Sequence, residues 1–225
     1  MKPRVGLITI GQSPRSDITP DLFSIWEDKI SVIEKGALDN LTPHEIGMLK
    51  PVPGETVLVS RLRDGKSATL AEERLIPLIK QQISFLEDCV DLIFLMCTGK
   101  FNGLSSQVPL IQPDGILRNT VKGILEDNQI LGVLVPEKEQ IAEVENIWKS
   151  YFSNKVKIVT AYGSPYKDIN LIQKGAESLK KQGADLVVLD CMGYSTFMKK
   201  EVKAITDKPV ILPRTLIARI IQEIV

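Results

Sequence analysis

Short apolar runs alternate along the chain with longer segments in which apolar residues recur at helical spacing. The short runs are rich in β-branched residues and mostly apolar on both faces, which is typical of strands that helices cover on both sides. The predicted strands are Val5–Ile10, Ser31–Glu34, Thr56–Ser60, Leu92–Met96, Pro109–Ile111, Ile130–Val135, Val156–Thr160, Leu186–Asp190 and Val210–Leu212. This alternation predicts an α/β protein with mainly parallel sheets.

The predicted helices begin at recognisable start signals. Ser13-Pro14 predicts an N-cap followed by proline at the first helical position, and Thr42-Pro43 repeats this pattern with Glu45 as a capping partner. Further helices are predicted over Ala68–Leu86, Glu137–Tyr151 and Leu171–Lys181, and a tight turn at Asp64-Gly65.

An internal repeat is the most informative feature of the sequence. Asp91–Gly99 is echoed by Asp185–Gly193, and each segment is a buried-type strand that ends in Cys-x-Gly. Downstream, Pro109–Arg118 resembles Pro209–Arg219. The period is much longer than that of solenoid repeats, so the sequence predicts two similar α/β halves that arose by duplication of a small domain.

The repeat places two thiols at equivalent positions. In open parallel sheets, ligands bind beyond the carboxyl ends of the strands, and Cys97 and Cys191 both occupy such a position. If the halves face each other, the two thiols flank one cleft, which suits removal of a proton from one face of a carbon and delivery to the other. A free cysteine has a pKa of about 8.5, so backbone N–H groups exposed by Gly99 and Gly193 would have to favour the thiolate.

The cysteines also allow interpretations in which they have no catalytic role. Cys89, Cys97 and Cys191 are odd in number and widely spaced, unlike a disulfide framework, so reduced thiols in the cytoplasm are expected. A buried inert thiol is the favoured interpretation for Cys89 and an alternative for the other two. The chain has no Cys-x-x-Cys or Cys/His spacing, and His44 is its only histidine, so no metal site is predicted.

Two further segments are candidates for binding an anionic substrate. Gly11-Gln12-Ser13 joins the first strand to a predicted helix, where exposed N–H groups can hold a carboxylate. This loop lacks the glycine patterns of dinucleotide and P-loop sites. Arg61, with Arg63 and Lys66, surrounds the predicted turn and could form a flap that carries a cation to a carboxylate. A plain strand–helix turn and a solvated surface are the respective alternatives.

Composition and charge narrow the classes of function. Of the 225 residues, 28 are Lys or Arg and 28 are Asp or Glu, so the net charge of zero disfavours nucleic-acid binding. The longest apolar runs, such as Leu92–Cys97, are far shorter than the roughly 20 residues that cross a bilayer. The N-terminal apolar stretch meets Gly11 and Pro14 before a signal-peptide core forms. A cytoplasmic protein without a membrane span is therefore expected.

With its two similar halves and strand-end cysteines, the chain resembles the aspartate/glutamate racemase superfamily and, within it, the AroM family. The resemblance runs from the opening Gly-Leu-Ile-Thr-Ile-Gly through Leu-Asp-Cys-Met-Gly-Tyr to the closing Leu-Ile-Ala-Arg. It implies two pseudo-symmetric three-layer α/β/α domains with an active-site cleft between them. The implied halves are residues 1–112 plus 213–225 and residues 113–212, with the last helix packing back on the first half. A homodimer is also implied.

The superfamily pattern further implies chemistry that needs no cofactor, with one of Cys97 and Cys191 as base and the other as acid. The neighbours of the two cysteines normally hold the substrate, which points to Thr98, Gly99, Met192, Gly193 and Tyr194. Amino-acid racemases usually have Asn-Thr after the first cysteine and Thr followed by His or Glu after the second, and this chain departs from both patterns.

Three functions follow as expectations. The first is a cofactor-independent isomerase or racemase acting on a small carboxylate or cyclic amide by two-cysteine proton transfer. The second is a lyase or decarboxylase that uses a single cysteine. The third is a non-catalytic small-molecule-binding protein on the racemase fold, which the altered residues after both cysteines favour.

Overall fold

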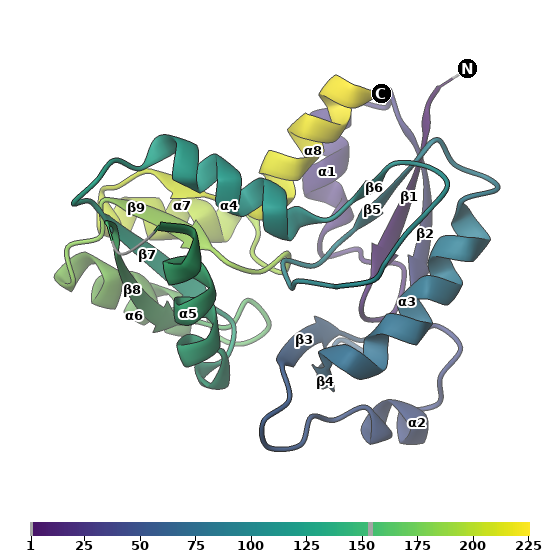
Figure 1. The fold of residues 1–225 in the computed structure, drawn as a ribbon, viewed down its shortest axis with the longest axis horizontal. Coiled ribbons are helices and arrows are strands. Elements are labelled where there is room, and N and C mark those ends of the chain that lie inside the picture. The colour runs from purple at the N-terminus through teal and green to yellow at the C-terminus, as the bar shows by residue number, and fades with distance from the viewer. Residues whose placement is uncertain (1, 153–154) are drawn as a thin grey trace. The chain divides into compact units, whose positions relative to one another are not determined.

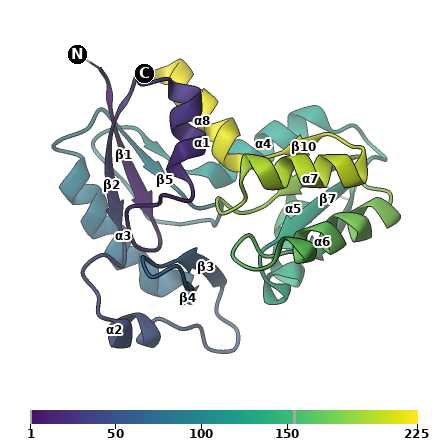
Figure 2. The same ribbon diagram turned by 180° about the vertical axis from the view of Figure 1, so that it is seen from behind.

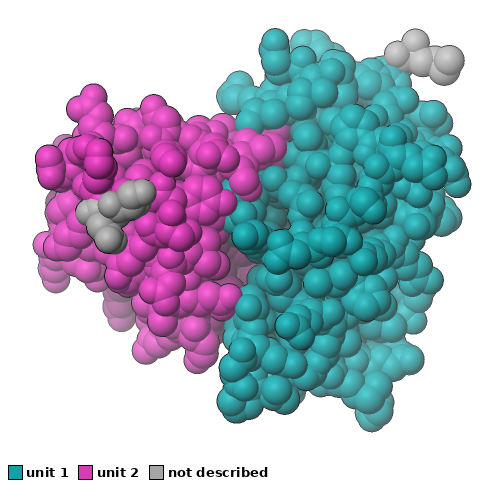
Figure 3. Space-filling model, in the orientation of Figure 1, with its two compact units in different colours: residues 1–114, 218–225 teal, residues 115–217 magenta. Residues whose placement is uncertain are grey.

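The computed structural model describes residues 2–152 and 155–225. The chain divides into two compact units, residues 1–114 with 218–225 (unit 1) and residues 115–217 (unit 2), which Figure 3 shows in different colours. Within the described ranges, no helix combines the length and apolar character needed to cross a membrane.

Unit 1 is built on a four-stranded parallel sheet in the order β2-β1-β5-β6. Its strands are β1 (Arg4–Thr9), β2 (Ser31–Gly36), β5 (Leu92–Leu95) and β6 (Leu110–Ile111). Helix α3 (Glu72–Leu86) covers one face of this sheet, and α1 (Thr19–Trp26) and part of α8 (Pro213–Ile224) cover the other (Figure 1).

From Val5 to Thr9, side chains on both faces of β1 are fully buried, as the apolar strand pattern predicted. On the face of α3, Ile8 belongs to a core cluster with Leu75 and Ile83. On the other face, the indole Nε1 of Trp26 donates to the backbone oxygen of Ala218, 2.9 Å away. This bond ties the C-terminal helix to α1.

Unit 2 repeats the same plan, with a parallel sheet in the order β8-β7-β9-β10. Its strands are β7 (Ile130–Val135), β8 (Lys157–Tyr162), β9 (Leu186–Leu189) and β10 (Val210–Ile211). Its helices are α4 (Pro113–Ile124), the 3-10 turn η1 (Lys138–Gln140) with α5 (Ile141–Phe152), α6 (Ile169–Lys181) and α7 (Thr196–Thr206). Two separate core clusters place α4 and α5 on one face of the sheet and α6 and α7 on the other (Figures 1 and 2).

The sequence repeat corresponds to a structural repeat. Asp91 accepts a hydrogen bond from the backbone N–H of Arg4 (2.7 Å), and Asp185 accepts one from Ile130 (3.0 Å). Each aspartate thus ties the start of β5 or β9 to the start of the neighbouring central strand. The Ile130 N–H, together with Lys208, holds the pKa of Asp185 below its usual value. The fold class predicted from the sequence is therefore confirmed: two α/β units with parallel sheets and the same strand order.

The predicted helix over Ala68–Leu86 is wrong at its beginning. Residues Ser67–Ala71 form strand β4, which pairs antiparallel with β3 (Val57–Arg61) in a hairpin outside the parallel sheet. The predicted turn at Asp64-Gly65 closes this hairpin, and Gly65 adopts a φ of 82°. Leu70 fits a period of two as well as a helical period, so periodicity alone assigned these residues to the helix that follows.

The predicted helix start at Ser13-Pro14 is also wrong, whereas the one at Thr42-Pro43 is confirmed. Helix α1 begins only at Thr19, because Ser13 donates from its backbone N–H and its hydroxyl to Asp39 instead of capping a helix. By contrast, Thr42 and Glu45 form a complete capping box at the start of α2 (Pro43–Met48).

Candidate functional site

The two predicted catalytic thiols follow the central strands β5 and β9, one in each unit. Cys97 is 7% exposed and Cys191 is partly exposed, and both are free cysteines. The backbone N–H of Gly99 donates to the sulfur of Cys97 (3.4 Å), and that of Gly193 donates to the sulfur of Cys191 (3.3 Å). The repeat therefore preserves the same N–H···S contact at both strand ends.

This contact has a direct chemical consequence. A hydrogen bond donated to sulfur stabilises the thiolate more than the thiol, and the thiolate is the form that acts as a base or nucleophile. The neighbouring strand holds the residue before each cysteine. The backbone N–H of Met96 donates to the backbone oxygen of Ile8 (2.8 Å), and that of Asp190 donates to the backbone oxygen of Leu134 (2.9 Å). Both sulfurs thus face a backbone donor whose position the sheet determines.

The two glycines have different surroundings. A Cβ at Gly99 would lie 3.1 Å from a side-chain carbon of Leu58 and 3.4 Å from one of Phe101. A Cβ at Gly193 would lie only 2.5 Å from the hydroxyl oxygen of Tyr166. The backbone geometry is repeated, whereas the side chains that pack over it are apolar in one unit and phenolic in the other.

The loop after Cys191 is held by buried polar groups. Arg214, 1% exposed, donates from Nε (2.9 Å) and Nη2 (2.7 Å) to the backbone oxygen of Met192. Tyr194 is fully buried, and its hydroxyl donates to the oxygen of Gly163 (2.8 Å). Burial raises the pKa of Tyr194 well above its usual value, and the charges of Cys191 and Asp190 add to this shift, so the hydroxyl remains a neutral donor.

Met192 and Tyr194 were predicted to contact substrate, and both are buried, at 3% and 0% exposed, with Tyr194 in a core cluster of unit 2. Their visible contribution is to position the loop that carries Cys191. Thr98, the corresponding neighbour of Cys97, is also buried. Substrate contact by these residues stays a prediction.

Arg214→Leu is expected to loosen the loop after Cys191, because it leaves the Met192 carbonyl without its two guanidinium donors. An unsatisfied buried carbonyl costs about 1–3 kcal/mol. We expect a loss of that size in the free energy of unfolding from urea titrations, and faster amide exchange at Gly193. The matched control is Arg219→Leu, since Arg219 lies exposed on the same helix. Equal effects of the two changes would contradict this role for Arg214.

A second polar network lies directly beneath Cys191. The carboxylate of Asp190 accepts a hydrogen bond from the indole Nε1 of Trp148 (2.8 Å) and pairs with Arg118 at 3.8 Å. The guanidinium of Arg118 lies over the Trp148 ring, 4.5 Å from its centroid. Since Asp190 immediately precedes Cys191, this network anchors the end of β9.

The predicted carboxylate-binding loop Gly11-Gln12-Ser13 is engaged by other parts of unit 1. Both Ser13 donors point to Asp39, at 2.7 Å for the backbone N–H and 2.6 Å for the hydroxyl. The Gln12 side-chain oxygen accepts from the backbone N–H of Arg63 (3.1 Å), whose guanidinium also pairs with Asp39 (2.7 Å). A carboxylate does occupy the Ser13 donors, and it is that of Asp39.

The hairpin that was predicted to be a flap packs against this loop. A Cβ at Gly11 would lie 2.3 Å from the Ser60 hydroxyl and 2.5 Å from the Arg61 backbone oxygen, so only glycine fits beside β3. Arg61 itself is half-buried at the end of β3, and its backbone oxygen accepts from Gln12 (3.5 Å). The structure thus joins Gly11, Gln12 and Arg61, while Arg63 provides the cation that pairs with a carboxylate.

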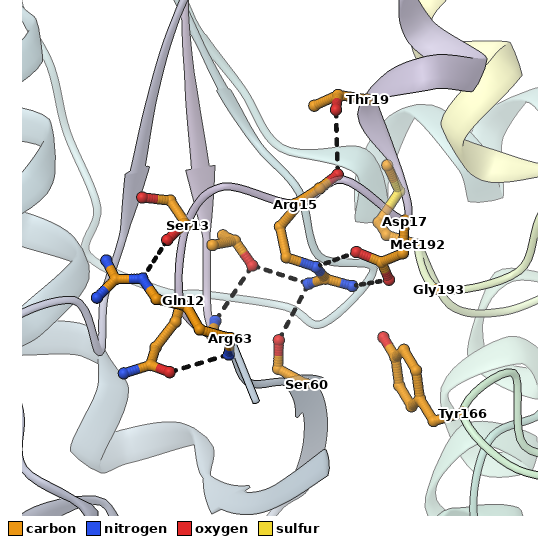
Figure 4. A network of polar contacts seen from close by, with 12 residues as sticks. Gln12, Ser13, Arg15, Asp17, Thr19, Ser60, Arg63, Tyr166, Met192 and Gly193 are labelled. Carbon is orange, nitrogen blue, oxygen red and sulfur yellow. Dashed lines mark hydrogen bonds and ion pairs between the residues drawn. The ribbon is translucent and has the colours of Figure 1, made fainter. Parts of the chain in front are cut away.

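Sequence reasoning missed Arg15 as a central residue of this loop. Its guanidinium is 3% exposed and grips Asp17 with two bonds of 2.8 Å (Figure 4). Its Nη1 donates to the hydroxyls of Thr9 (2.9 Å) and Ser60 (3.1 Å). The Arg-x-Asp spacing was the only signal in the sequence, and it could not show that β3 would bring Ser60 to the same guanidinium.

The third cysteine lies apart from the two predicted catalytic thiols. The thiol of Cys89 contacts the backbone oxygen of Phe85 (3.2 Å) after helix α3, away from the strand ends. Among the residues that the structure describes, no three His, Cys, Asp or Glu side chains come together as a metal-binding group.

The fold has relatives among solved structures. The chain is similar to a glutamate racemase isoform from Bacillus anthracis, with 12% identity and a TM-score of 0.63 over 99% of this chain and 81% of that one. It is similar to the maleate isomerase Iso from Pseudomonas putida, with 13% identity and a TM-score of 0.64 over 99% and 92% of the two chains. It is also similar to arylmalonate decarboxylase, with 12% identity and a TM-score of 0.58 over 98% and 92%.

These similarities define the class of the fold: a two-unit α/β protein of the glutamate-racemase type. No curated protein matches the chain in sequence. The family described as "AroM protein" matches residues 5–225, and the chain therefore belongs to the AroM family.

Proposed function

We propose that this AroM-family protein is a cofactor-independent isomerase or racemase that acts on a small carboxylate or cyclic amide, with Cys97 and Cys191 as its acid–base pair. The observation that carries the proposal is the repeated strand-end geometry. Both sulfurs follow a central strand and accept a hydrogen bond from the backbone N–H of the glycine two residues further on. A duplicated fold that keeps a thiol and its donor at both equivalent positions supports a reaction that needs two such groups.

The chemistry is a balanced proton exchange. One thiolate removes a proton from a carbon next to a carbonyl, so a C–H bond breaks, an S–H bond forms and the electron pair passes to the carbonyl. The other thiol then donates its proton to the opposite face of that carbon and becomes the thiolate. Acid–base catalysis of this kind contributes about 10²–10⁴-fold, so backbone N–H groups that stabilise the intermediate anion must supply much of the remaining rate enhancement.

The substrate class rests on two arguments. Proton removal from carbon needs an adjacent carbonyl, which carboxylates and cyclic amides provide. In addition, the glutamate racemase and the maleate isomerase that share this fold are named for small carboxylates. Unit 1 contains the type of group that binds a carboxylate, since Arg63 and Ser13 already hold that of Asp39.

A single-thiol lyase is the second candidate, and the unequal surroundings of the thiols favour it. The hydroxyl of Tyr166 lies 3.9 Å from the sulfur of Cys191, whereas carbons of Leu58 and Phe101 surround Gly99. A decarboxylation needs only one proton donor, and arylmalonate decarboxylase shares the fold. In this case one cysteine would matter much more than the other.

The proposal is tested by solvent-deuterium exchange followed by NMR. The wild-type protein is incubated in D₂O with panels of amino acids, hydantoins and small dicarboxylates. We expect loss of a C–H signal next to a carbonyl in at least one substrate class, without added metal or cofactor. Release of CO₂ from a dicarboxylate would favour the lyase. Binding of a panel member, detected by line broadening, without exchange or product would contradict catalysis and favour a binding protein on the racemase fold.

A further inference from the structure

Tyr166 lies against the thiol of Cys191, although no sequence pattern singled it out. It belongs to the segment between β8 and α6, and its hydroxyl oxygen is 3.9 Å from the sulfur. Figure 4 shows Tyr166 with its hydroxyl end directed toward the loop of Met192 and Gly193. Tyr166 and Cys191 are 25 residues apart in the sequence and belong to the same unit.

The packing at Gly193 fixes the position of the phenol. A Cβ at this residue would lie 2.5 Å from the hydroxyl oxygen of Tyr166, 2.6 Å from the ring carbon that bears it and 2.9 Å from Pro165. The phenol therefore occupies the space that any other residue at 193 would fill with a side chain. Gly193 also donates its backbone N–H to the sulfur of Cys191. The sulfur therefore has two potential donors beside it, this N–H and the Tyr166 hydroxyl.

We propose that Tyr166 is a positioning residue for Cys191. Its phenol donates a hydrogen bond to the Cys191 thiolate and so favours the ionised form of this cysteine. When Cys191 carries its proton, either the Tyr166 hydroxyl or the Cys191 thiol can be the donor in this contact. When Cys191 is a thiolate, the phenol of Tyr166 must be the donor. Charge-assisted hydrogen bonds are stronger than neutral ones, so the contact favours ionisation. The inference deepens the proposed function, on which it rests for the role of Cys191 in proton transfer.

Several other ionisable groups around Cys191 and Tyr194 have partners of their own. Asp190 binds Trp148 and Arg118, and Tyr194 remains neutral with its hydroxyl on the oxygen of Gly163. Glu137, whose charge acts on Tyr194, pairs with Lys167 at 2.8 Å, and Arg214 holds the oxygen of Met192. These groups are retained when Tyr166 is changed, so a difference between wild type and variant reports the phenol.

The experiment measures the rate of alkylation by iodoacetamide as a function of pH, separately for each cysteine, by mass spectrometry of peptides. In Tyr166→Phe, we expect the midpoint for Cys191 to rise by about 0.5 pH units, which lowers its alkylation rate below the midpoint by about threefold. The midpoint for Cys97 should stay unchanged in the same sample. Tyr162→Phe is the matched control, because Tyr162 lies nearby on β8 and packs against Lys138 instead.

An unchanged or lower midpoint for Cys191 would overturn the inference, and so would an equal rise at Cys97. A second measurement leaves Tyr166 intact, in case the Phe variant does not fold. In protein labelled with ¹³C at the tyrosine Cζ, the Tyr166 signal should titrate at the alkylation midpoint of Cys191, and this step should disappear in Cys191→Ala. Its persistence in that variant would also overturn the inference. Because neither readout needs turnover, binding of a panel member without exchange or product would contradict the proposed function without affecting this test.

Discussion

Cys97→Ala and Cys191→Ala are each expected to lower the rate of substrate deuterium exchange by at least about 100-fold, the lower end of what one acid or base contributes. Each change removes one of the two groups that exchange a proton with the substrate carbon. The double variant should be little worse than either single variant, because groups that act as a unit are not additive. Rates are measured by NMR in D₂O on the substrate class that the wild-type panel identifies.

Cys89→Ala is the matched control for this series, because it removes a thiol that lies at the end of α3. It should retain the wild-type rate. Full activity of either Cys97→Ala or Cys191→Ala would contradict the two-thiol mechanism. A loss confined to one of them would instead identify the single proton donor of a lyase.

Asp190→Ala is expected to destabilise unit 2 by about 3–5 kcal/mol, the largest stability effect we predict. The change removes the buried carboxylate that accepts a hydrogen bond from Trp148 and pairs with Arg118. Arg118 is itself buried, with 2% of its surface exposed. Removing one partner of a buried ion pair is costly because the other charge stays in the interior. Asp190→Asn should cost less, since the amide oxygen can still accept the indole hydrogen bond.

The loss of stability is measured by urea unfolding followed by tryptophan fluorescence, because each unit contains one tryptophan. Trp26 lies in unit 1 and Trp148 in unit 2, so fluorescence in a Trp26→Phe background reports on unit 2. The control is Asp127→Ala, which removes an exposed ion pair with Lys155 and should change stability by less than about 1 kcal/mol.

Adding Arg118→Leu to Asp190→Ala tests the physical reason for this loss. If an uncompensated charge is the cause, the double variant should recover part of the stability, since it removes that charge. A double variant less stable than Asp190→Ala would show that lost packing, and not the buried charge, accounts for the effect.

The sequence by itself determined the fold class and the positions of the two thiols. Strands covered on both faces must be apolar throughout, so β1, β5, β7 and β9 were visible as apolar runs. The repeat of Asp91–Gly99 at Asp185–Gly193 also showed that one local structure occurs twice. Since both the aspartate bond and the glycine N–H···S contact depend on the strand and its ends, copying the segment copied the contacts.

Only the tertiary structure decided which side chains surround those positions. Arg15 meets Ser60 across 45 residues, Trp26 meets Ala218 across 192, and Tyr166 meets Cys191 across 25. The same holds for Ser13, whose helix-capping pattern gave way to Asp39, 26 residues away. Local patterns recorded the choice between helix and strand for the central strands and the long helices, because that choice depends mostly on neighbours in sequence. They failed at Ser67–Ala71, where pairing with β3 decides for a strand. Contacts between loops depend on how the sheet brings distant segments together, and no periodicity in the sequence encodes that.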